Sequence, residues 1–400
     1  MRVFLADKLS TSCLDALHRA GHEVVNRPDA KGDALRDALA ESNPSVLVVR
    51  STKVSGDLMA AAPALELVVR AGAGYDTIDV ASASASGIFV ANCPGKNAVA
   101  VAELTLGLIL SLDRSIPDNV IDARAGRWNK EKYSRAEGVK GRTLGLIGMG
   151  NIGREVAIRA RAFGLRVIAW SRSLTPEHAH EMGISHRESP IDVALEADIV
   201  SFHVAATADT KGLAGAAFFA AMKPGSLLLN TTRSSVVDED ALLHAMEHKG
   251  IRAGLDVFSE EPAGKDGVFS SRLAAHPNAY VTHHIGASTE QAQEAIAAEA
   301  VRIVNVYAET GEVPNCVNIA ERSAATHQLT VRHFDRVGVL AAVFAEMKTA
   351  GWNVQEVENL VFAGAPAACA YIRFAGTPDS ATVERISAHP DVLAVTLITL

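Results

Sequence analysis

The sequence has few cysteines and no long hydrophobic run. The four cysteines, Cys13, Cys93, Cys316 and Cys369, are scattered without a CxxC pair, which disfavours a disulfide framework and a thiolate metal site. No apolar run approaches the ~20 residues that span a bilayer, and the N-terminus has the pattern of a first strand rather than a signal peptide. The net charge of -8 disfavours nucleic acid and anionic membranes as partners. We expect a reduced, cytoplasmic protein without a metal ion.

Two or three domains are expected, because 400 residues exceed one compact core. Short apolar runs alternate with helical patterns over about the first 96 residues, and again from Thr143 to Val257. This alternation is typical of doubly wound parallel sheets with helices on both faces. Beyond a polar stretch around Pro314 the predicted order becomes βαββαβ, which is typical of a small ferredoxin-like domain. The predicted fold class is therefore α/β, with two parallel-sheet domains and a smaller C-terminal one.

A glycine-rich loop follows the apolar run Leu144–Ile147. It reads Gly148-Met149-Gly150-Asn151-Ile152-Gly153 and opens an amphipathic helix pattern. In a Rossmann-type domain the first glycine of such a loop makes the turn, and the N-terminus of the following helix faces a pyrophosphate. We predict that Gly148, Gly150, Asn151, Ile152 and Gly153 bind NAD or NADP.

The next predicted strand, Leu165–Trp170, is followed by Ser171-Arg172. A Rossmann domain usually carries an acid here, on the adenosine ribose. A serine and an arginine could bind the 2′-phosphate of NADP, but Arg172 could equally pack on the adenine of NAD. The pair slightly favours NADP and leaves both cofactors open.

Three downstream segments carry polar residues of the kinds that catalysis needs. They are Asn230–Glu239, Leu255–Pro262 and His284–Thr289. With the glycine loop, and with Val69–Asp76 and Asn97–Glu103 upstream, they resemble the signature set of the D-isomer-specific 2-hydroxyacid dehydrogenases. The resemblance covers essentially the whole chain. It implies a flavodoxin-like substrate domain beside the Rossmann domain, with the active site in the cleft between them.

The resemblance also assigns roles to individual residues. His284 is the implied base for the hydroxyl proton, since an imidazole titrates near working pH. Glu261 is implied to orient that imidazole, and Arg233 to grip the substrate carboxylate through its planar fork. The implied cofactor contacts beyond the glycine loop are Thr231, Thr232, Asp256 (which receives the nicotinamide amide), Gly286 and Ala287.

Two positions depart from the family pattern. His283 stands where the family often has proline before the catalytic histidine, and we interpret it as structural. Ser234-Ser235 replaces the usual glycines after the arginine, which we expect to reshape the turn.

The substrate is predicted from possible anion contacts. Gly72, Ala73 and Gly74 would offer backbone N–H groups to a carboxylate. Arg50 and Lys130 match basic positions at the substrate cleft of the phosphoglycerate dehydrogenase branch of the family. The resemblance thus implies oxidation of 3-phosphoglycerate to 3-phosphohydroxypyruvate, which enters serine synthesis. An NADPH-dependent glyoxylate/hydroxypyruvate reductase and a dinucleotide-sensing binding protein on the same scaffold remain alternatives.

The C-terminal domain resembles the ACT module of bacterial phosphoglycerate dehydrogenases. His333, Asp335 and Asn353 fall where that module binds L-serine between subunits, although Val337 replaces the family's proline. The resemblance implies a homodimer or homotetramer.

The predicted domain boundaries follow from these assignments. The substrate domain comprises residues 1–96 and 285–315, and the dinucleotide-binding domain residues 97–284. A linker follows at 316–325, and the ACT-type domain at 326–400.

Overall fold

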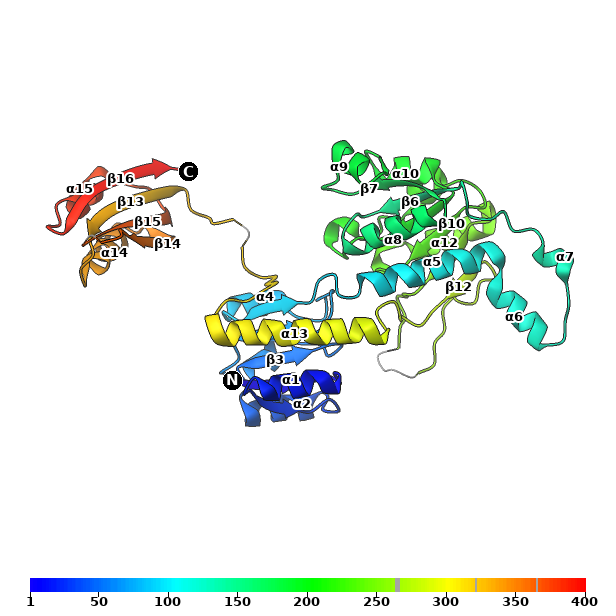
Figure 1. Ribbon diagram of the computed structural model, residues 1–400, viewed down its shortest axis with the longest axis horizontal. Coiled ribbons are helices and arrows are strands. Elements are labelled where there is room, and N and C mark those ends of the chain that lie inside the picture. Colours follow the sequence, from blue (N-terminus) through cyan, green and yellow to red (C-terminus); the bar gives the residue numbers. More distant parts are fainter. Residues whose placement is uncertain (263–266, 321, 365) are drawn as a thin grey trace. The chain divides into compact units, whose positions relative to one another are not determined.

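The computed structural model describes residues 1–262, 267–320, 322–364 and 366–400, which form two compact units, Met1–Asn318 and Ile319–Leu400 (Figure 1). Unit 1 contains two parallel sheets, each in its own lobe, and unit 2 contains one antiparallel sheet. The predicted fold class is therefore confirmed.

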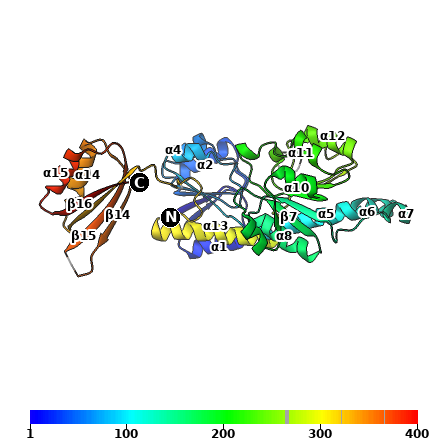
Figure 2. The same ribbon diagram turned by 90° about the horizontal axis from the view of Figure 1, so that it is seen from above.

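The first lobe of unit 1 is built on a five-stranded parallel sheet in the order β2-β1-β3-β4-β5. Helices α1 and α13 pack on one face, and α2, α3 and α4 on the other, so the central strand β3 is buried along its whole length. Helix α13 comes from a later part of the chain (Figures 1 and 2). The elements are β1 (Arg2–Leu5), α1 (Thr11–Arg19), β2 (Glu23–Asn26), α2 (Asp33–Ser42), β3 (Val46–Val49), α3 (Gly56–Ala60), β4 (Leu67–Arg70), α4 (Val80–Ala85), β5 (Phe89–Asn92) and α13 (Glu290–Thr310).

The second lobe is built on a seven-stranded parallel sheet in the order β12-β11-β10-β9-β6-β7-β8. Helices α10, α11 and α12 cover one face, and α5, α8 and α9 the other. The elements are α5 (Ala98–Arg114), α6 (Ile116–Arg124), α7 (Lys130–Tyr133), β6 (Thr143–Ile147), α8 (Asn151–Ala162), β7 (Arg166–Trp170), α9 (Pro176–Glu181), β8 (Ser185–His186), α10 (Pro190–Glu196), β9 (Ile199–Phe202), η1 (Ala208–Thr210), α11 (Ala216–Ala221), β10 (Leu227–Asn230), η2 (Ser234–Val236), α12 (Glu239–Lys249), β11 (Arg252–Leu255) and β12 (Ala279–Val281).

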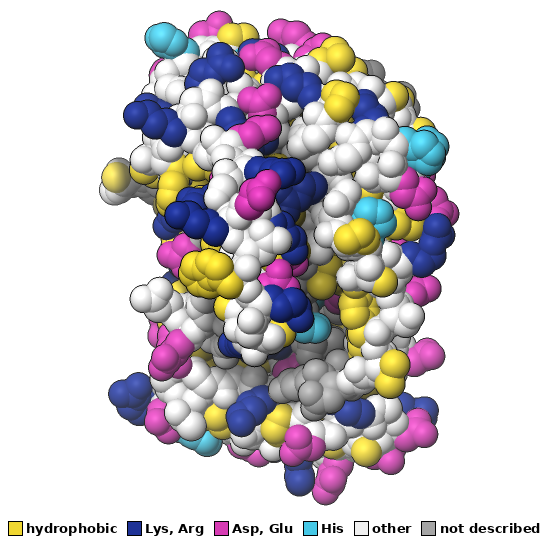
Figure 3. Space-filling model, turned by 90° about the vertical axis from the view of Figure 1, so that its right-hand side faces the viewer, with side chains coloured by type: hydrophobic (Ala, Val, Ile, Leu, Met, Phe, Trp, Pro, Cys, Tyr) yellow, Lys and Arg dark blue, Asp and Glu magenta, His cyan; other side chains and the backbone are white. Residues whose placement is uncertain are grey.

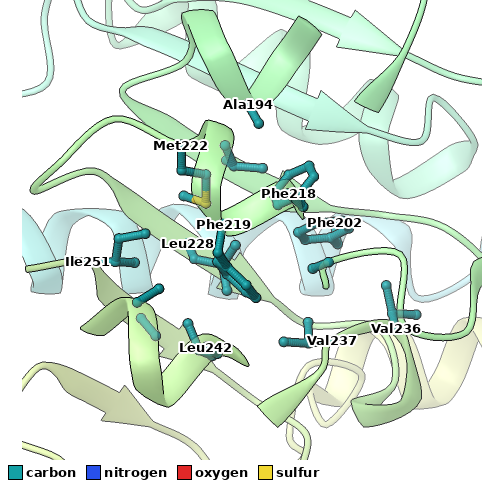
Figure 4. Close-up of a cluster of buried hydrophobic side chains, with 14 of the residues drawn as sticks. Ala194, Phe202, Phe218, Phe219, Met222, Leu228, Val236, Val237, Leu242 and Ile251 are labelled. Carbon is teal, nitrogen blue, oxygen red and sulfur yellow. The ribbon is translucent and has the colours of Figure 1, made fainter. Parts of the chain in front are cut away.

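The core of the second lobe also anchors a functional loop. Figure 4 shows Phe202 of β9 and Phe218 of α11 in this core. The centroids of the two rings are 5.3 Å apart. Val236 and Val237 are buried in the same cluster. The loop that carries Arg233 is therefore fixed to the core three residues downstream of that arginine.

Helices α6 and α7 form an arm, residues 116–133, that projects from the second lobe in both ribbon views (Figures 1 and 2). Neither helix has a buried residue, and Trp128 is 88% exposed. Figure 3 faces this end of the molecule and shows hydrophobic side chains among charged ones. The arm has internal bonds of its own, since Asp122 accepts from Tyr133 at 2.6 Å and pairs with Arg127 and Lys132.

Unit 2 is a four-stranded antiparallel sheet in the order β14-β15-β13-β16, with α14 and α15 packed on one face. Its elements are β13 (His327–Phe334), α14 (Val339–Thr349), β14 (Asn353–Val361), β15 (Ala367–Ala375), α15 (Ser380–Ser387) and β16 (Val392–Thr399). Among the residues described, no helix combines the length and apolarity of a membrane-spanning segment.

The start of the predicted linker belongs to the first lobe. The N–H of Val317 donates to Val90 O, and the Asn318 side chain bonds to the backbone of Ile88 and Val90. The connection between the units therefore begins after Asn318. Glu321, also in the predicted linker, lies outside the described residues.

Candidate active site

The predicted cofactor and catalytic residues of unit 1 follow the carboxyl ends of parallel strands. The glycine loop follows β6, Arg233 follows β10, Asp256 follows β11 and His284 follows β12. In the first lobe Arg50 follows β3. Parallel α/β sheets bind ligands at this edge because the strand ends converge there.

The geometry of the glycine loop fits a dinucleotide. A Cβ on Gly148 (φ +104°) would lie 2.4 Å from His203 O, and one on Gly153 would lie 2.2 Å from Gly148 O. Glycine is thus required at both positions for the loop to approach its neighbours. Gly150, by contrast, faces open space, and no side chain in the described part of the chain caps α8. The free N–H groups of the first turn of α8 remain available to a pyrophosphate.

Ser171 and Arg172 lie beside this loop, because β7 pairs with β6 and the N–H of Gly148 donates to Trp170 O at 2.8 Å. The Ser171 carbonyl accepts from Leu174 N and closes a turn. Arg172 is exposed. The pair is where an adenosine ribose is expected, and no carboxylate directly follows β7.

His203 is a buried histidine next to the glycine loop that the sequence analysis did not single out. Its Nε2 lies 2.9 Å from Ser201 Oγ, and its Nδ1 has no partner among the described residues. Burial lowers the pKa of His203 to about 3. The ring is therefore neutral near pH 7 and is not suited to hold the substrate proton.

Asp256 holds the loop that carries the predicted catalytic histidine. Its Oδ1 accepts from Thr282 Oγ1 at 2.5 Å and from Ile285 N at 2.8 Å, while its Oδ2 accepts from Gly286 N at 2.8 Å. A Cβ on Gly286 would lie 3.0 Å from Oδ2. Both carboxylate oxygens are therefore engaged in shaping this loop, and the nicotinamide amide expected there would have to share them.

The nearby threonines belong to another ordered turn. Asn230 Oδ1 accepts from both the N–H and the hydroxyl of Thr232, at 3.0 and 2.7 Å. Thr231 Oγ1 lies 3.4 Å from Thr105 Oγ1 on α5. Both threonines are buried, so the turn that leads to Arg233 is rigidly packed.

His284 and Glu261 form a hydrogen-bonded pair. His284 Nδ1 lies 2.7 Å from Glu261 Oε2, and Glu261 Oε1 accepts from Phe258 N at 2.9 Å. The carboxylate is thus fixed by the backbone and in turn fixes the ring, so Nε2 is left for a ligand. His284 adopts φ +52°, a left-handed conformation that functional sites often hold at some energetic cost. His283 is exposed.

Arg233 makes an ion pair with Asp76, a residue of the first lobe that the sequence analysis left without a role. Arg233 Nη2 lies 3.0 Å from Asp76 Oδ1, and Nε lies 3.4 Å from Oδ2. Burial would raise the pKa of Asp76, but the bonds and charge of Arg233 outweigh it and lower that pKa. Ser234 and Ser235 do not have positive φ angles, so glycine is not required in this turn.

The loop after β4 only partly matches its predicted role. The N–H of Gly72 donates to Arg70 O at 2.8 Å in a tight turn, so it is not free for a substrate carboxylate. Among the described residues no group accepts from the N–H of Ala73 or Gly74. The N–H groups of Ala73 and Gly74, but not that of Gly72, therefore remain available to a substrate carboxylate.

Arg50 lies in a loop organised by Asp7 at the end of β1. Asp7 Oδ2 accepts from the N–H of Arg50, Ser51 and Thr52 at 2.7, 3.0 and 3.0 Å. Burial alone would raise the pKa of Asp7, but these bonds and Lys31 lower it. Among the described residues, the Arg50 guanidinium makes a single 3.5 Å contact, with Gln293, so it remains available to a ligand.

Arg70, the last residue of β4, is a half-buried cation that was not predicted as a site residue. Its Nε has no partner among the described residues, and Nη1 makes one 3.4 Å bond, to Ala71 O. Burial lowers the pKa of Arg70, and the charges of Arg233 and Arg50 lower it further. A charged residue directly after an apolar run was the available signal, although burial itself cannot be read from sequence.

Within one chain the structure does not bring Lys130 to Arg50. Lys130 is the exposed first residue of α7, at the tip of the arm (Figures 1 and 2). The expectation that both cations line one phosphate site therefore does not hold within a single copy.

The predicted effector residues are also separated within one copy of unit 2. His333 pairs with Ala368 on β15, whereas Asn353 pairs with Ala375. Their partners are seven residues apart on β15, and β13 and β14 flank β15 on opposite sides, so His333 and Asn353 lie about 25 Å apart. Both ring nitrogens of His333 are within hydrogen-bond distance of acceptors, Phe334 O at 2.7 Å and Asn359 Oδ1 at 3.2 Å. The N–H of Asp335 donates to Pro366 O.

Comparison with known proteins relates this geometry to a family. A model described as D-isomer specific 2-hydroxyacid dehydrogenase, NAD binding domain, matches residues 106–286. The D-3-phosphoglycerate dehydrogenase of Bacillus subtilis is 37% identical over 320 residues, which are 80% of this chain and 59% of the relative. That of Mycobacterium bovis is 36% identical over 361 residues, 88% of this chain and 66% of the relative. The chain thus spans less than two thirds of the length of these curated relatives.

Solved structures of related proteins match about four fifths of the chain. A protein from Thermus thermophilus is 34% identical with a TM-score of 0.70, over 79% of this chain and 100% of that one. An NADPH-dependent glyoxylate/hydroxypyruvate reductase from Sinorhizobium meliloti, in complex with NADP and malonate, is 30% identical with a TM-score of 0.67. The match covers 79% of this chain and 96% of that one.

Proposed function

The chain belongs to the D-isomer specific 2-hydroxyacid dehydrogenase family, and from that premise we propose that it oxidises 3-phosphoglycerate to 3-phosphohydroxypyruvate with NAD or NADP. The curated relatives named D-3-phosphoglycerate dehydrogenase support this substrate. Because the chain spans only part of their length, the proposal is based on the residues of the chain itself.

The observation that carries the proposal is the half-buried guanidinium of Arg70, to which no carboxylate is hydrogen-bonded among the described residues. Removing a cation from water is costly, and an anionic ligand that pairs with it would lower this cost. Arg233 and Arg50 lie close enough to lower the pKa of Arg70, whereas Asp76 is the acid that offsets part of this charge. Glyoxylate has a single carboxylate, which Arg233 alone could bind. The additional cations fit a substrate with a second anionic group, such as a phosphate.

The substrate carboxylate would bind to Arg233 and to the free N–H groups of Ala73 and Gly74, while Arg70 and Arg50 bind the phosphate. The dinucleotide would be held by Gly148, Gly150, Asn151, Ile152 and Gly153, with Ser171 and Arg172 at the adenosine end. Thr231, Thr232, Asp256, Gly286 and Ala287 would lie at the nicotinamide end. The oxidised nicotinamide, when bound, supplies an acceptor for a hydride.

His284 would remove the hydroxyl proton at Nε2 as the hydride leaves C2 of the substrate. Its Nδ1 bond to Glu261 fixes the ring orientation, and the carboxylate favours the imidazolium that forms. Arg233 would hold the carboxylate and the developing carbonyl oxygen with a planar fork. Together these residues position the C2–H bond and accept the proton.

A steady-state comparison tests the proposal, with phosphohydroxypyruvate, hydroxypyruvate and glyoxylate each assayed with NADH and with NADPH. We expect kcat/KM for phosphohydroxypyruvate to exceed that for hydroxypyruvate by at least about 10-fold, since one charge-assisted bond contributes roughly 1.5–3 kcal/mol. Equal values for the two substrates would remove the case for a phosphorylated substrate.

A second candidate is an NADPH-dependent glyoxylate/hydroxypyruvate reductase. The observation that favours it is the Ser171-Arg172 pair, which offers a 2′-phosphate a cation and no repelling carboxylate. The same assays separate the two functions, because this candidate requires a preference for NADPH and efficient turnover of glyoxylate.

Unit 2 is proposed to be an ACT-type regulatory domain of a cytoplasmic homodimer or homotetramer, with L-serine as its effector. Support comes from the antiparallel βαββαβ topology and from the separation of His333 and Asn353. Residues about 25 Å apart in one copy could meet only across an interface between copies. The exposed Trp128 of the arm gives unit 1 a second surface for self-association, which would bring Lys130 towards another copy.

A further inference from the structure

We propose that Asp76 is a positioning residue that holds the guanidinium of Arg233 in the orientation that receives the substrate carboxylate. The inference rests on the proposed function of Arg233. It applies equally to every 2-hydroxy acid, because it concerns the carboxylate that all of them share.

Asp76 occupies one edge of the Arg233 guanidinium and leaves another edge free. A guanidinium presents hydrogen-bond donors on distinct edges of a planar fork. Asp76 takes the edge formed by Nε and Nη2, at 3.4 and 3.0 Å. The carbonyl of Thr232 takes one hydrogen of Nη1 at 2.8 Å. The edge between Nη1 and Nη2 is left, and it offers two parallel donors for a bidentate carboxylate.

The guanidinium of Arg233 lies against the backbone of Gly74. A Cβ on Gly74 would be 2.2 Å from Arg233 Nη2 and 3.0 Å from Asp76 Oδ1. The absence of a side chain at Gly74 therefore creates the space in which the ion pair forms. The same residue offers one of the two free N–H groups of the loop. The acidic partner of Arg233 and a free backbone donor thus belong to one short segment, residues 74–76.

The ion pair of Arg233 and Asp76 connects the two lobes of unit 1. Arg233 follows β10 of the second lobe, and Asp76 lies in the loop after β4 of the first. An arginine side chain has several rotatable bonds, and fixing them before the substrate arrives lowers the entropic cost of binding. Because the pair is one-third to one-half exposed (31% for Arg233, 54% for Asp76), its contribution to overall stability is small. Its effect should appear in substrate binding and turnover.

Kinetics of Asp76→Ala and Asp76→Asn form the first test, using NADH with whichever 2-oxo acid is turned over best. We expect kcat/KM to fall at least 10-fold in Asp76→Ala, with less loss in Asp76→Asn, which keeps an acceptor oxygen. The dissociation constant for NADH, from fluorescence titration, should stay within about 2-fold of wild type. Asp240→Ala, which removes another exposed arginine-paired aspartate, is the matched control and should change neither.

Chemical rescue gives a result that a merely structural role would not produce. Activity lost in Arg233→Ala should be partly restored by free guanidinium ion, because Asp76 can still bind this ion where the Arg233 side chain lay. In Arg233→Ala/Asp76→Ala the guanidinium rescue should be lost. Equal rescue in the single and double variants would overturn the proposal, as would tighter substrate binding in Asp76→Ala, which would make Asp76 a competitor of the substrate.

A binding measurement separates this inference from the proposed function. Hydroxypyruvate is titrated into the full-length protein loaded with NAD, a pair that cannot react by hydride transfer to the acid. Asp76→Ala should weaken this binding about 10-fold. If phosphohydroxypyruvate is no substrate but this weakening is found, the proposed substrate fails and the role of Asp76 stands. If the binding is unchanged, the role of Asp76 fails whatever the substrate.

Discussion

Replacing Arg70 by methionine should separate substrate recognition from stability. The change removes a guanidinium whose Nε has no partner among the described residues and whose Nη1 makes one long bond. Methionine is unbranched and flexible, so it can follow the path of the arginine stem beside Gly72. The substitution therefore tests the claim that this cation is kept for a ligand.

The structure permits an estimate of both effects. An unsatisfied buried donor costs roughly 1–3 kcal/mol, and an imperfect change of volume costs about 1.5 kcal/mol at most. The free energy of unfolding should therefore change by between about -0.5 and +3 kcal/mol, a Tm shift of roughly -1 to +6 °C for a unit of this size. Loss of a charge-assisted bond to phosphate, about 1.5–3 kcal/mol, should raise KM for phosphohydroxypyruvate about 10- to 150-fold.

The assays are thermal unfolding and steady-state kinetics with phosphohydroxypyruvate and hydroxypyruvate. KM for hydroxypyruvate should change less than about 3-fold, since it lacks the group that makes the bond. Arg302→Met is the control, because Arg302 is paired with the buried Glu299 at 2.7 Å; it should lower Tm and leave both KM values unchanged. A Tm of Arg70→Met that is more than about 2 °C below wild type, or equal increases of KM for the two substrates, would refute the reasoning.

Three further predictions address the base, the loop of Arg50 and unit 2. His284→Ala should lower kcat by at least about 100-fold, the usual contribution of general acid–base catalysis, while His283→Ala should lower kcat far less. The reverse result would show that the base is assigned to the wrong histidine. Asp7→Asn should lower Tm at pH 7, because the folded-state pKa of Asp7 is depressed and its stabilisation exists above the unfolded pKa and is lost as pH falls through the folded one. The Tm difference from wild type should therefore vanish on acidification, and a difference that grew would contradict this sign. A chain ending at Ala320 should keep catalysis, form a smaller oligomer in light scattering and lose any inhibition by L-serine, whereas serine inhibition of equal potency would disprove the regulatory assignment.

The fold could be predicted from sequence because its elements depend on local patterns. Strands such as Val46–Val49 are apolar runs flanked by amphipathic helices, and this pattern alone specifies parallel sheets buried on both faces. The glycine loop was predictable for the same reason, since strand, glycines and helix are contiguous in the chain. The ion pair of Arg233 and Asp76 was not, because it joins residues of two lobes whose proximity depends on tertiary packing.

The motifs also predicted roles for some residues that their hydrogen bonds in the structure do not fully allow. Gly72 stands in a segment that matches a carboxylate-binding loop, but its N–H is used by the turn itself. Arg70 lies two residues earlier in the same segment and received no role. Its importance depends on burial and on missing partners, and neither property is visible in sequence.

The return of α13 to the first lobe has a consequence for biosynthesis. One face of the sheet β1–β5 is covered by α1 and, over the rest, by Ile296, Val301 and neighbouring residues of α13, which follows β5 after about 200 residues of the second lobe. At a synthesis rate of roughly 5–20 residues per second, the part that α13 covers stays exposed for about 10–40 s. A nascent first lobe therefore exposes apolar sheet surface while the second lobe is being synthesised. We expect the ribosome-bound chain to recruit hold-type chaperones in this interval, and the second lobe to become protease-resistant before the first.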